Sequence, residues 1–270
     1  MYVILDDWRT WAPQFRDWIT QRFSPVVLES FTRNAEPSWL EWLDTQQAGV
    51  DGHLQNSVSL FKIEVLRRYA GVRVFHATRM ANLETVKEGG LRAWSSEELR
   101  NSAIHLSEDG VDPRILEQAI VKCDPETRGG YVYSFASLHH ALGDPVDDAS
   151  GSLPDFCRDG GEFLSCVRRQ LGQKEISGPD TTAYLFACDL PWGLLEAEDL
   201  QYFAKTMLLT SLTEAYIGEG FSMHGENSCV TTSRSIPPEN IALFSEVENL
   251  LGRNDLRIED IHWSPLHTDQ

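Results

Sequence analysis

Residues able to do polar chemistry lie in three short segments that are otherwise apolar. His76 lies in the segment Val-Phe-His-Ala-Thr-Arg, Tyr131 and Tyr133 alternate in a second segment, and Glu226 follows a glycine before a third. A neutral imidazole donates one hydrogen bond and accepts another. A carboxylate stabilises positive charge that develops during a reaction. These residue types are therefore candidates for binding a hydroxyl group and for stabilising a cation.

Several other reaction chemistries lack their motifs in this sequence. His139 and His140 are adjacent and would point in different directions, and no carboxylate or cysteine nearby completes a ligand set, so we expect no metal site. The sequence has no Gly-x-Ser-x-Gly elbow and no Gly-x-x-x-x-Gly-Lys phosphate loop. The tetrapeptide Gly-Gly-Glu-Phe at 160–163 matches diguanylate cyclases by its letters alone.

The elements before Gly71 are predicted to be helical. Trp8, Trp11, Phe15 and Trp18 recur at helical spacing and would share one face. Helices are predicted over 7–20, 37–43 and 57–69, and a proline lies near the first turn of the second one. The glycines and polar residues over 46–56 predict a loop.

The pattern changes at Gly71 to short runs rich in β-branched and aromatic residues. Asn82 is expected to cap a short helix that ends at Gly89-Gly90, and a further helix or helix pair is expected over 197–211. A long loop is predicted over 143–160. The predicted strands cover 72–77, 103–106, 131–135, 163–167, 183–188 and 228–233.

Three of these segments resemble, in order, the ADP-ribosyltransferase fold of the His-Tyr-Glu type. Val74–Arg79, followed by a helix and the turn Gly89-Gly90-Leu91-Arg92, is similar to the opening of that fold. Residues 131–137 resemble its second motif strand. His224-Gly225-Glu226, followed by a strand and Ile236-Pro237-Pro238-Glu239, resembles its third. The resemblance covers residues 72–245.

The resemblance implies an α+β fold with a split, mostly antiparallel β core. The expected organisation is a helical N-terminal region over residues 1–70, an ADP-ribosyltransferase-like catalytic domain over 71–252 and a polar C-terminal tail over 253–270.

It also implies that NAD is the substrate and that its nicotinamide–ribose bond is cleaved through an oxocarbenium-like sugar cation. By this resemblance Glu226 would stabilise the cation and hold a ribose hydroxyl, and His76 would hydrogen-bond a ribose hydroxyl. The backbone of Ala77 would pair with the nicotinamide amide, and Tyr131 or Tyr133 would stack on the nicotinamide ring.

The resemblance also implies which residues contact the pyrophosphate of NAD and which residue helps to choose the acceptor. Thr78 and Arg79 complete the predicted NAD-binding set, and Arg79 or Arg92 would meet the pyrophosphate, because a guanidinium suits phosphate oxygens. His224 lies where several branches of the family hold Glu or Gln to choose the acceptor. A histidine there leaves the acceptor undetermined and is compatible with one other than arginine. The family's tyrosine on the helix after the second strand has no counterpart over 138–142.

The resulting prediction is an NAD-dependent mono-ADP-ribosyltransferase that modifies a macromolecule, with a protein favoured over nucleic acid as acceptor. A target or neutralising protein is the expected partner. The alternatives are an NAD hydrolase, an RNA 2′-phosphotransferase of the same fold, and a catalytically silent protein-binding module. Without the flanking motifs, His76 would be interpreted as a structural residue and Glu226 as a solvated turn residue.

The amino-acid composition indicates the cellular environment and the kinds of partner that we expect. The net charge of −18 over 270 residues favours solubility and disfavours binding of naked nucleic acid unless a local basic groove exists. No apolar run is long enough for a membrane span, and the N-terminus does not resemble a signal peptide. The five scattered cysteines favour a reducing compartment. We therefore expect a cytoplasmic protein, including one delivered into a host or competitor cell.

Overall fold

The chain forms two compact units in the computed structural model. The helical unit comprises Met1–Val72 and Pro191–Glu226, and the sheet unit comprises Arg73–Leu190 and Asn227–Gln270. Residues 191–226 had been expected in the second region and belong to the helical unit. The structure describes residues 1–24, 26, 47–50, 53–106, 111–138, 161–172, 181–218, 229–251 and 258–267.

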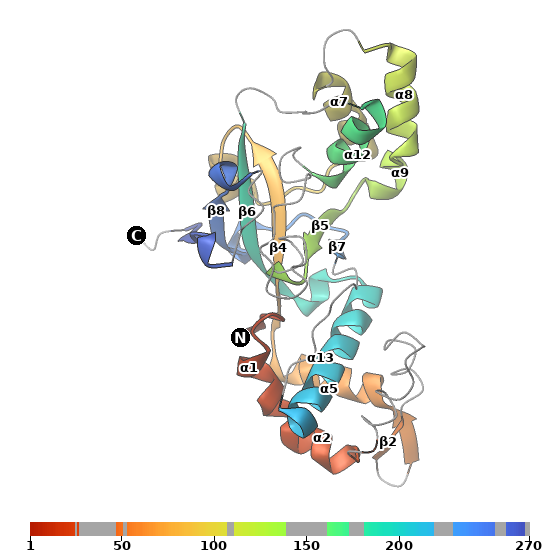
Figure 1. Cartoon of the computed structure of the whole chain (residues 1–270), viewed down its shortest axis with the longest axis vertical. Helices are drawn as coiled ribbons and strands as arrows, with labels where there is room; N and C mark the ends of the chain where they lie inside the picture. The colour runs from red at the N-terminus through yellow and green to blue at the C-terminus, as the bar shows by residue number, and fades with distance from the viewer. Residues whose placement is uncertain are drawn as a thin grey trace. The chain divides into compact units, whose positions relative to one another are not determined.

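The helical unit is built around α13 (Ala197–Ile217), which contacts α2 (Arg16–Arg22), the 3-10 helix η1 (Ala12–Phe15) and α5 (Ser57–Arg68). α1 (Trp8–Trp11) precedes η1 (Figure 1). The predicted helices over 7–20 and 57–69 are thus confirmed, although Pro13 divides the first. The helical spacing of the aromatic residues explains the core, because Trp11, Phe15 and Phe61 are almost fully buried.

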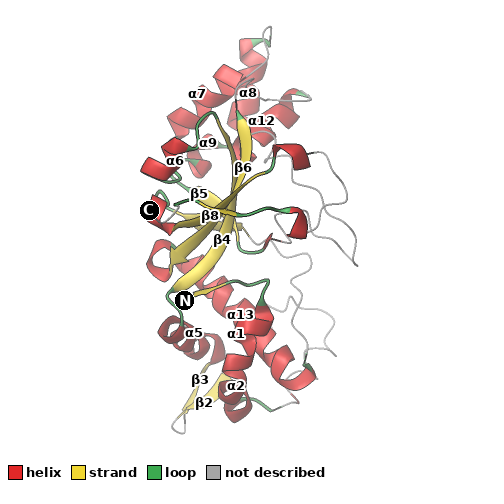
Figure 2. Ribbon diagram, turned by 90° about the vertical axis from the view of Figure 1, so that its left-hand side faces the viewer, coloured by secondary structure: helices red, strands yellow, loops and turns green. Residues whose placement is uncertain are grey.

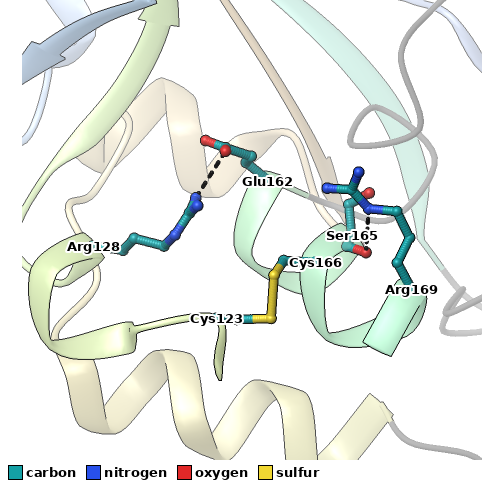
Figure 3. Close-up of a disulfide and its surroundings, with 6 residues drawn as sticks. All are labelled: Cys123, Arg128, Glu162, Ser165, Cys166 and Arg169. Atoms are coloured by element: carbon teal, nitrogen blue, oxygen red, sulfur yellow. Dashed lines mark hydrogen bonds and ion pairs between the residues drawn. A yellow bond between two sulfur atoms is a disulfide. The ribbon is translucent and has the colours of Figure 1, made fainter. Parts of the chain in front are cut away.

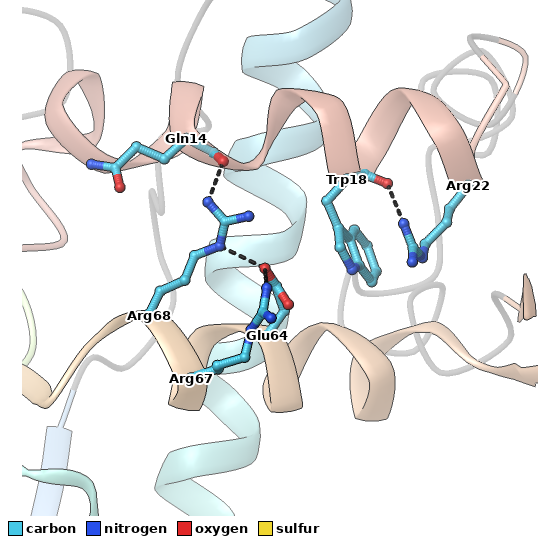
Figure 4. A network of polar contacts seen from close by, with 6 residues as sticks. All are labelled: Gln14, Trp18, Arg22, Glu64, Arg67 and Arg68. Atoms are coloured by element: carbon cyan, nitrogen blue, oxygen red, sulfur yellow. Dashed lines mark hydrogen bonds and ion pairs between the residues drawn. The ribbon is translucent and has the colours of Figure 1, made fainter.

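Arg68 of α5 joins this helix to η1 (Figure 4). The Arg68 Nε donates to Oε1 of Glu64 at 2.6 Å, and its Nη1 donates to the carbonyl oxygen of Gln14 at 2.7 Å. A second ion pair joins Arg16 of α2 to Glu214 of α13. Such partly exposed pairs fix geometry more than they add stability.

The loop predicted over 46–56 is wrong. β2 (Gln47–Val50) and β3 (His53–Asn56) pair as an antiparallel hairpin. The glycines and polar residues that indicated a loop there are compatible with a hairpin. The Asn56 side chain then accepts a hydrogen bond from the Ser59 amide and caps α5. The helix predicted over 37–43 lies outside the described residues.

A seven-stranded sheet forms among the described residues, in the order β7-β5-β4-β6-β8-β9, with β1 (Tyr2–Val3) paired in parallel to the first residues of β4 (Figure 2). The β4–β5, β5–β7, β6–β8 and β8–β9 pairs are antiparallel. This confirms the α+β class. The bounds are β4 (Gly71–Met80), β5 (Val132–Phe135), β6 (Thr182–Pro191), β7 (Cys229–Thr232), β8 (Ile241–Glu246) and β9 (Ser264–Pro265).

The strands predicted over 72–77, 131–135, 183–188 and 228–233 are confirmed as β4, β5, β6 and β7. One apolar cluster on the sheet includes Phe75, Leu185, Leu250 and Ile261. The described part of the C-terminal tail therefore packs on the sheet, with the 3-10 helix η5 (Ile258–Asp260) and β9.

Two predicted strands are helices instead. Residues 103–106 end α7 (Ser96–Leu106), and residues 163–167 lie in α12 (Glu162–Leu171). These helices gather with α8 (Pro113–Lys122) and α9 (Pro125–Arg128) beside the sheet (Figure 1). They share an apolar cluster that includes Ala103, Ile120 and Val167. A short apolar run fits a buried strand and a helix equally well, and tertiary packing decided both cases.

A disulfide joins Cys123, just after α8, to Cys166 of α12 (Figure 3). The spacing of the cysteines did not indicate this pairing. Disulfides persist mainly in oxidising environments. The reducing compartment was inferred from the spacing of the cysteines alone, and it stays a prediction. Among the described residues, no helix is long and apolar enough to cross a membrane.

Candidate functional site

A cavity of about 790 Å³ lies in the sheet unit. Its walls come from β4, the segment around α6 (Glu84–Gly89), β5, α12 and the first residue of β7. The predicted site residues that line it are His76, Ala77, Thr78, Arg79, Arg92, Tyr131 and Tyr133. His224 and Glu226 lie outside the described residues, as do His139, His140 and the loop predicted over 143–160.

The imidazole of His76 is held across two neighbouring strands. Its Nδ1 lies 2.7 Å from the carbonyl oxygen of Tyr133. A carbonyl oxygen can only accept, so Nδ1 carries the proton and Nε2 is left as a hydrogen-bond acceptor. Burial lowers the pKa of His76, and the bond to the Tyr133 carbonyl opposes this shift. The ring is therefore neutral near pH 7 and offers an acceptor nitrogen at the cavity wall.

Two tyrosines form an aromatic part of the cavity wall. The ring centroids of Tyr131 and Tyr133 lie 6.3 Å apart at an interplanar angle of 58°. The residues between and after them, Val132 and Ser134, are buried, as strand alternation requires. Burial raises the pKa of Tyr133, while the nearby Arg128 lowers it. Tyr133 therefore remains a neutral phenol.

Two segments of the predicted motifs meet beside the cavity: the Gly-Gly-Leu-Arg turn at 89–92 and the Ile-Pro-Pro-Glu segment at 236–239. The amide of Leu91 donates to the carbonyl of Ile236, and the amide of Ile236 donates back to Leu91, both at 2.8 Å. Gly90 precedes this bridge with φ +74°, and a Cβ there would lie 2.1 Å from the Ile236 carbonyl oxygen. A glycine is required at this position for both reasons. The bridge fixes the Gly-Gly-Leu turn that lines the cavity.

Among the described residues, four arginines line the cavity, a concentration at odds with the acidic chain. Arg79 is buried and already engaged, because its Nη2 lies 2.7 Å from the Thr181 carbonyl oxygen and 3.0 Å from a carboxylate oxygen of Glu248. Arg92 pairs with Glu98 at 2.8 Å.

The other two arginines of the cavity wall, Arg128 and Arg169, are drawn in Figure 3. Their place in the site was not predicted. Arg128 pairs with Glu162 at 3.0 Å, and Nε of Arg169 lies 3.4 Å from the Ser165 carbonyl oxygen. Arg169 was missed because α12 was predicted as a strand, so its spacing from Glu162 carried no meaning. On a helix these residues are seven apart and share a face. The exposed Trp94 and the buried Phe163 also line the cavity and were not predicted.

The strand that follows Glu226 in the sequence reaches the cavity. Cys229, the first residue of β7, lines it and carries a reduced thiol. The buried Ser134 hydroxyl also lines it and has no hydrogen-bond partner in the described part of the chain. A ligand hydroxyl or carbonyl could pair with that group.

Within the described residues, no cluster of His, Cys, Asp and Glu could hold a metal ion. The cavity instead offers a neutral imidazole, aromatic rings and guanidinium groups, which suit the hydroxyls, rings and phosphates of a nucleotide. Searches against protein-family models and curated protein sequences found no match.

Proposed function

We propose that the chain is an NAD-dependent mono-ADP-ribosyltransferase whose donor site is the cavity between β4, β5 and α12. The observation that carries this proposal is that the three motif strands are adjacent, in the order β7-β5-β4. This order is independent of the sequence resemblance that suggested the motifs. It places β5, with Tyr133, between the strand of His76 and the strand that follows Glu226 in the sequence.

The geometry of His76 supports its proposed role. With Nδ1 donating to the Tyr133 carbonyl, Nε2 can accept a hydrogen bond from a ribose hydroxyl. A cationic imidazole could not accept this bond, and burial keeps the ring neutral. Tyr131 and Tyr133 supply rings on which nicotinamide can stack.

Glu226 enters the proposal from its position in the sequence. It precedes Cys229 by three residues, and three residues of extended chain reach at most about 11 Å. In the proposed step the bond between ribose C1′ and the nicotinamide nitrogen breaks, and its electron pair leaves with nicotinamide. The Glu226 carboxylate stabilises the developing sugar cation. The acceptor nucleophile attacks C1′ and releases its proton to water.

The test is incubation of the purified chain with NAD labelled in the ADP-ribose part and with a cell lysate, using the wild type, Glu226→Gln and Glu239→Gln. Glu239 is an exposed carboxylate that does not line the cavity, so its substitution matches the charge change. We expect labelled macromolecules from the wild type and Glu239→Gln, and a loss of at least about 100-fold in Glu226→Gln.

Two other results would change the assignment. Free nicotinamide without a labelled macromolecule would identify an NAD hydrolase. The absence of both products, together with no NAD binding, would leave the protein-binding module as the better account. Equal labelling by Glu226→Gln and the wild type would remove Glu226 from the mechanism.

A further inference from the structure

The cavity arginines differ in how much of each guanidinium is already used. Arg79 donates to Thr181 and Glu248, and 8% of its side chain is exposed. Arg92 and Arg128 each pair with one glutamate. Arg169 is exposed, and no carboxylate in the described residues lies within ion-pair distance of it. Within the described part of the chain, the terminal nitrogens of Arg169 are therefore the guanidinium donors of the cavity without a carboxylate partner.

The position of Arg169 on α12 gives that donor group a defined place. Its Nε lies 3.4 Å from the Ser165 carbonyl oxygen, one helical turn earlier, which directs the side chain back along the helix (Figure 3). Glu162 at the start of the same helix is neutralised by Arg128. Hence no unpaired carboxylate of α12 repels an anion near Arg169 in the described residues.

The helix itself is held firmly. The disulfide between Cys123 and Cys166 joins α12 to the end of α8, and the Arg128–Glu162 pair joins it to α9 (Figure 3). Phe163 and Val167 pack in the apolar cluster that α12 shares with α7 and α8. Arg169 therefore projects from a fixed element, which lowers the entropic cost of ordering it on a ligand.

We infer that Arg169 is the residue that recognises a phosphate group of the donor dinucleotide, as a specificity determinant of the cavity. This inference rests on the proposed function. The two terminal nitrogens of Arg169 have no hydrogen-bond partner among the described residues. Such a guanidinium matches two phosphate oxygens at once, which an ammonium group does not. Sequence reasoning had assigned this role to Arg79 or Arg92, whose side chains already have carboxylate partners.

The test compares ligands with and without phosphate in binding titrations. The ligands are ADP-ribose and nicotinamide riboside, and the proteins are the wild type, Arg169→Ala, Arg169→Lys and Arg114→Ala. Arg114 is exposed on α8 and does not line the cavity, so it controls for the lost charge. Unfolding temperatures establish that each variant is folded.

We expect Arg169→Ala to weaken ADP-ribose binding about 10- to 100-fold and to leave nicotinamide riboside binding within about twofold of the wild type. Arg169→Lys should recover part of the loss, and Arg114→Ala should resemble the wild type. Equal binding of ADP-ribose by Arg169→Ala and the wild type would overturn the inference while leaving the proposed function in place. So would an equal loss for both ligands, which would indicate a structural role. A wild type that binds neither ligand would overturn both proposals.

Discussion

At the residue scale, His76 shows how a strand neighbour selects the chemistry of a side chain. The Tyr133 carbonyl fixes the proton on Nδ1 and so turns Nε2 into an acceptor. Tyr133 on β5 and Tyr131, which directly precedes this strand, place their rings along the cavity wall. One backbone hydrogen bond thereby sets the tautomer beside the aromatic surface that nicotinamide would use.

His76 should make stability depend on pH. Burial lowers its pKa below the ordinary value of about 6.5, so the unfolded chain takes up this proton first on acidification. The contribution of His76 to stability should therefore be constant well above pH 6.5. It should fall as the pH drops from about 6.5 toward the lower native pKa. The slope from one proton is at most about 1.4 kcal/mol per pH unit.

Denaturant unfolding at several pH values between 7.5 and 5 measures this effect. His76→Asn retains a donor at the position of Nδ1 for the Tyr133 carbonyl but cannot titrate, so it should lose less stability on acidification than the wild type. The other histidines are common to both proteins and cancel in the difference. Equal losses in the two proteins would contradict the burial of a neutral His76.

At the element scale, the turn after α6 ties two distant segments together. Gly90 lies against the Ile236 carbonyl, and the Leu91–Ile236 bridge follows directly. This bridge connects the wall of the cavity to the segment between β7 and β8. The turn and the Ile-Pro-Pro segment are therefore one structural unit, although more than 140 residues separate them.

Substituting Gly90 should lower the free energy of unfolding more than substituting a glycine that has a similar backbone conformation and free space around it. Gly130 is the matched control, because its φ is +86° and an added Cβ would meet nothing within 4 Å. Gly130→Ala should cost about 1–2 kcal/mol from strain alone. Gly90→Ala should cost at least about 1 kcal/mol more, from overpacking against Ile236. Thermal unfolding of the two variants measures the difference, and equal costs would show that the turn moves freely away from Ile236.

The elements differ in how well the sequence predicted them. Alternation over 72–77 and the apolar run over 183–188 identified β4 and β6, because these strands are long and bordered by clear breaks. The apolar runs in α7 and α12 were too short to separate strand from helix. A better signal existed for α7, since Ser95 and Glu98 exchange hydrogen bonds as a capping box.

The candidate site was predictable in part for the same reason. Residues on the correctly predicted strands, such as His76 and Tyr133, lie together in the cavity. Residues on α9 and α12, such as Arg128 and Arg169, were missed because their contribution depends on tertiary packing of helices that the sequence pattern did not define. The Cys123–Cys166 bridge was missed likewise, since a separation of 43 residues carries no pairing signal.

At the scale of the whole molecule, charge is distributed unevenly. The chain carries 41 acidic and 23 basic residues, yet four arginines and one glutamate of the described residues line the cavity. Three of these arginines have glutamate partners, so Arg169 supplies the positive charge for a small anionic ligand, while the acidic chain disfavours a long polyanion. This distribution is consistent with a dinucleotide donor and with a protein acceptor.

The most direct measurement of the central claim, that NAD binds in this cavity, is the alkylation rate of Cys229 followed by peptide mass mapping. Cys229 lines the cavity and is partly exposed. Cys188 is buried and burial raises its thiol pKa, so it is an unreactive internal control. Saturating NAD should slow alkylation of Cys229 at least about tenfold, as expected when the site is about 90% occupied, and leave Cys188 unlabelled throughout. An unchanged rate at Cys229 under millimolar NAD would contradict a donor site in this cavity.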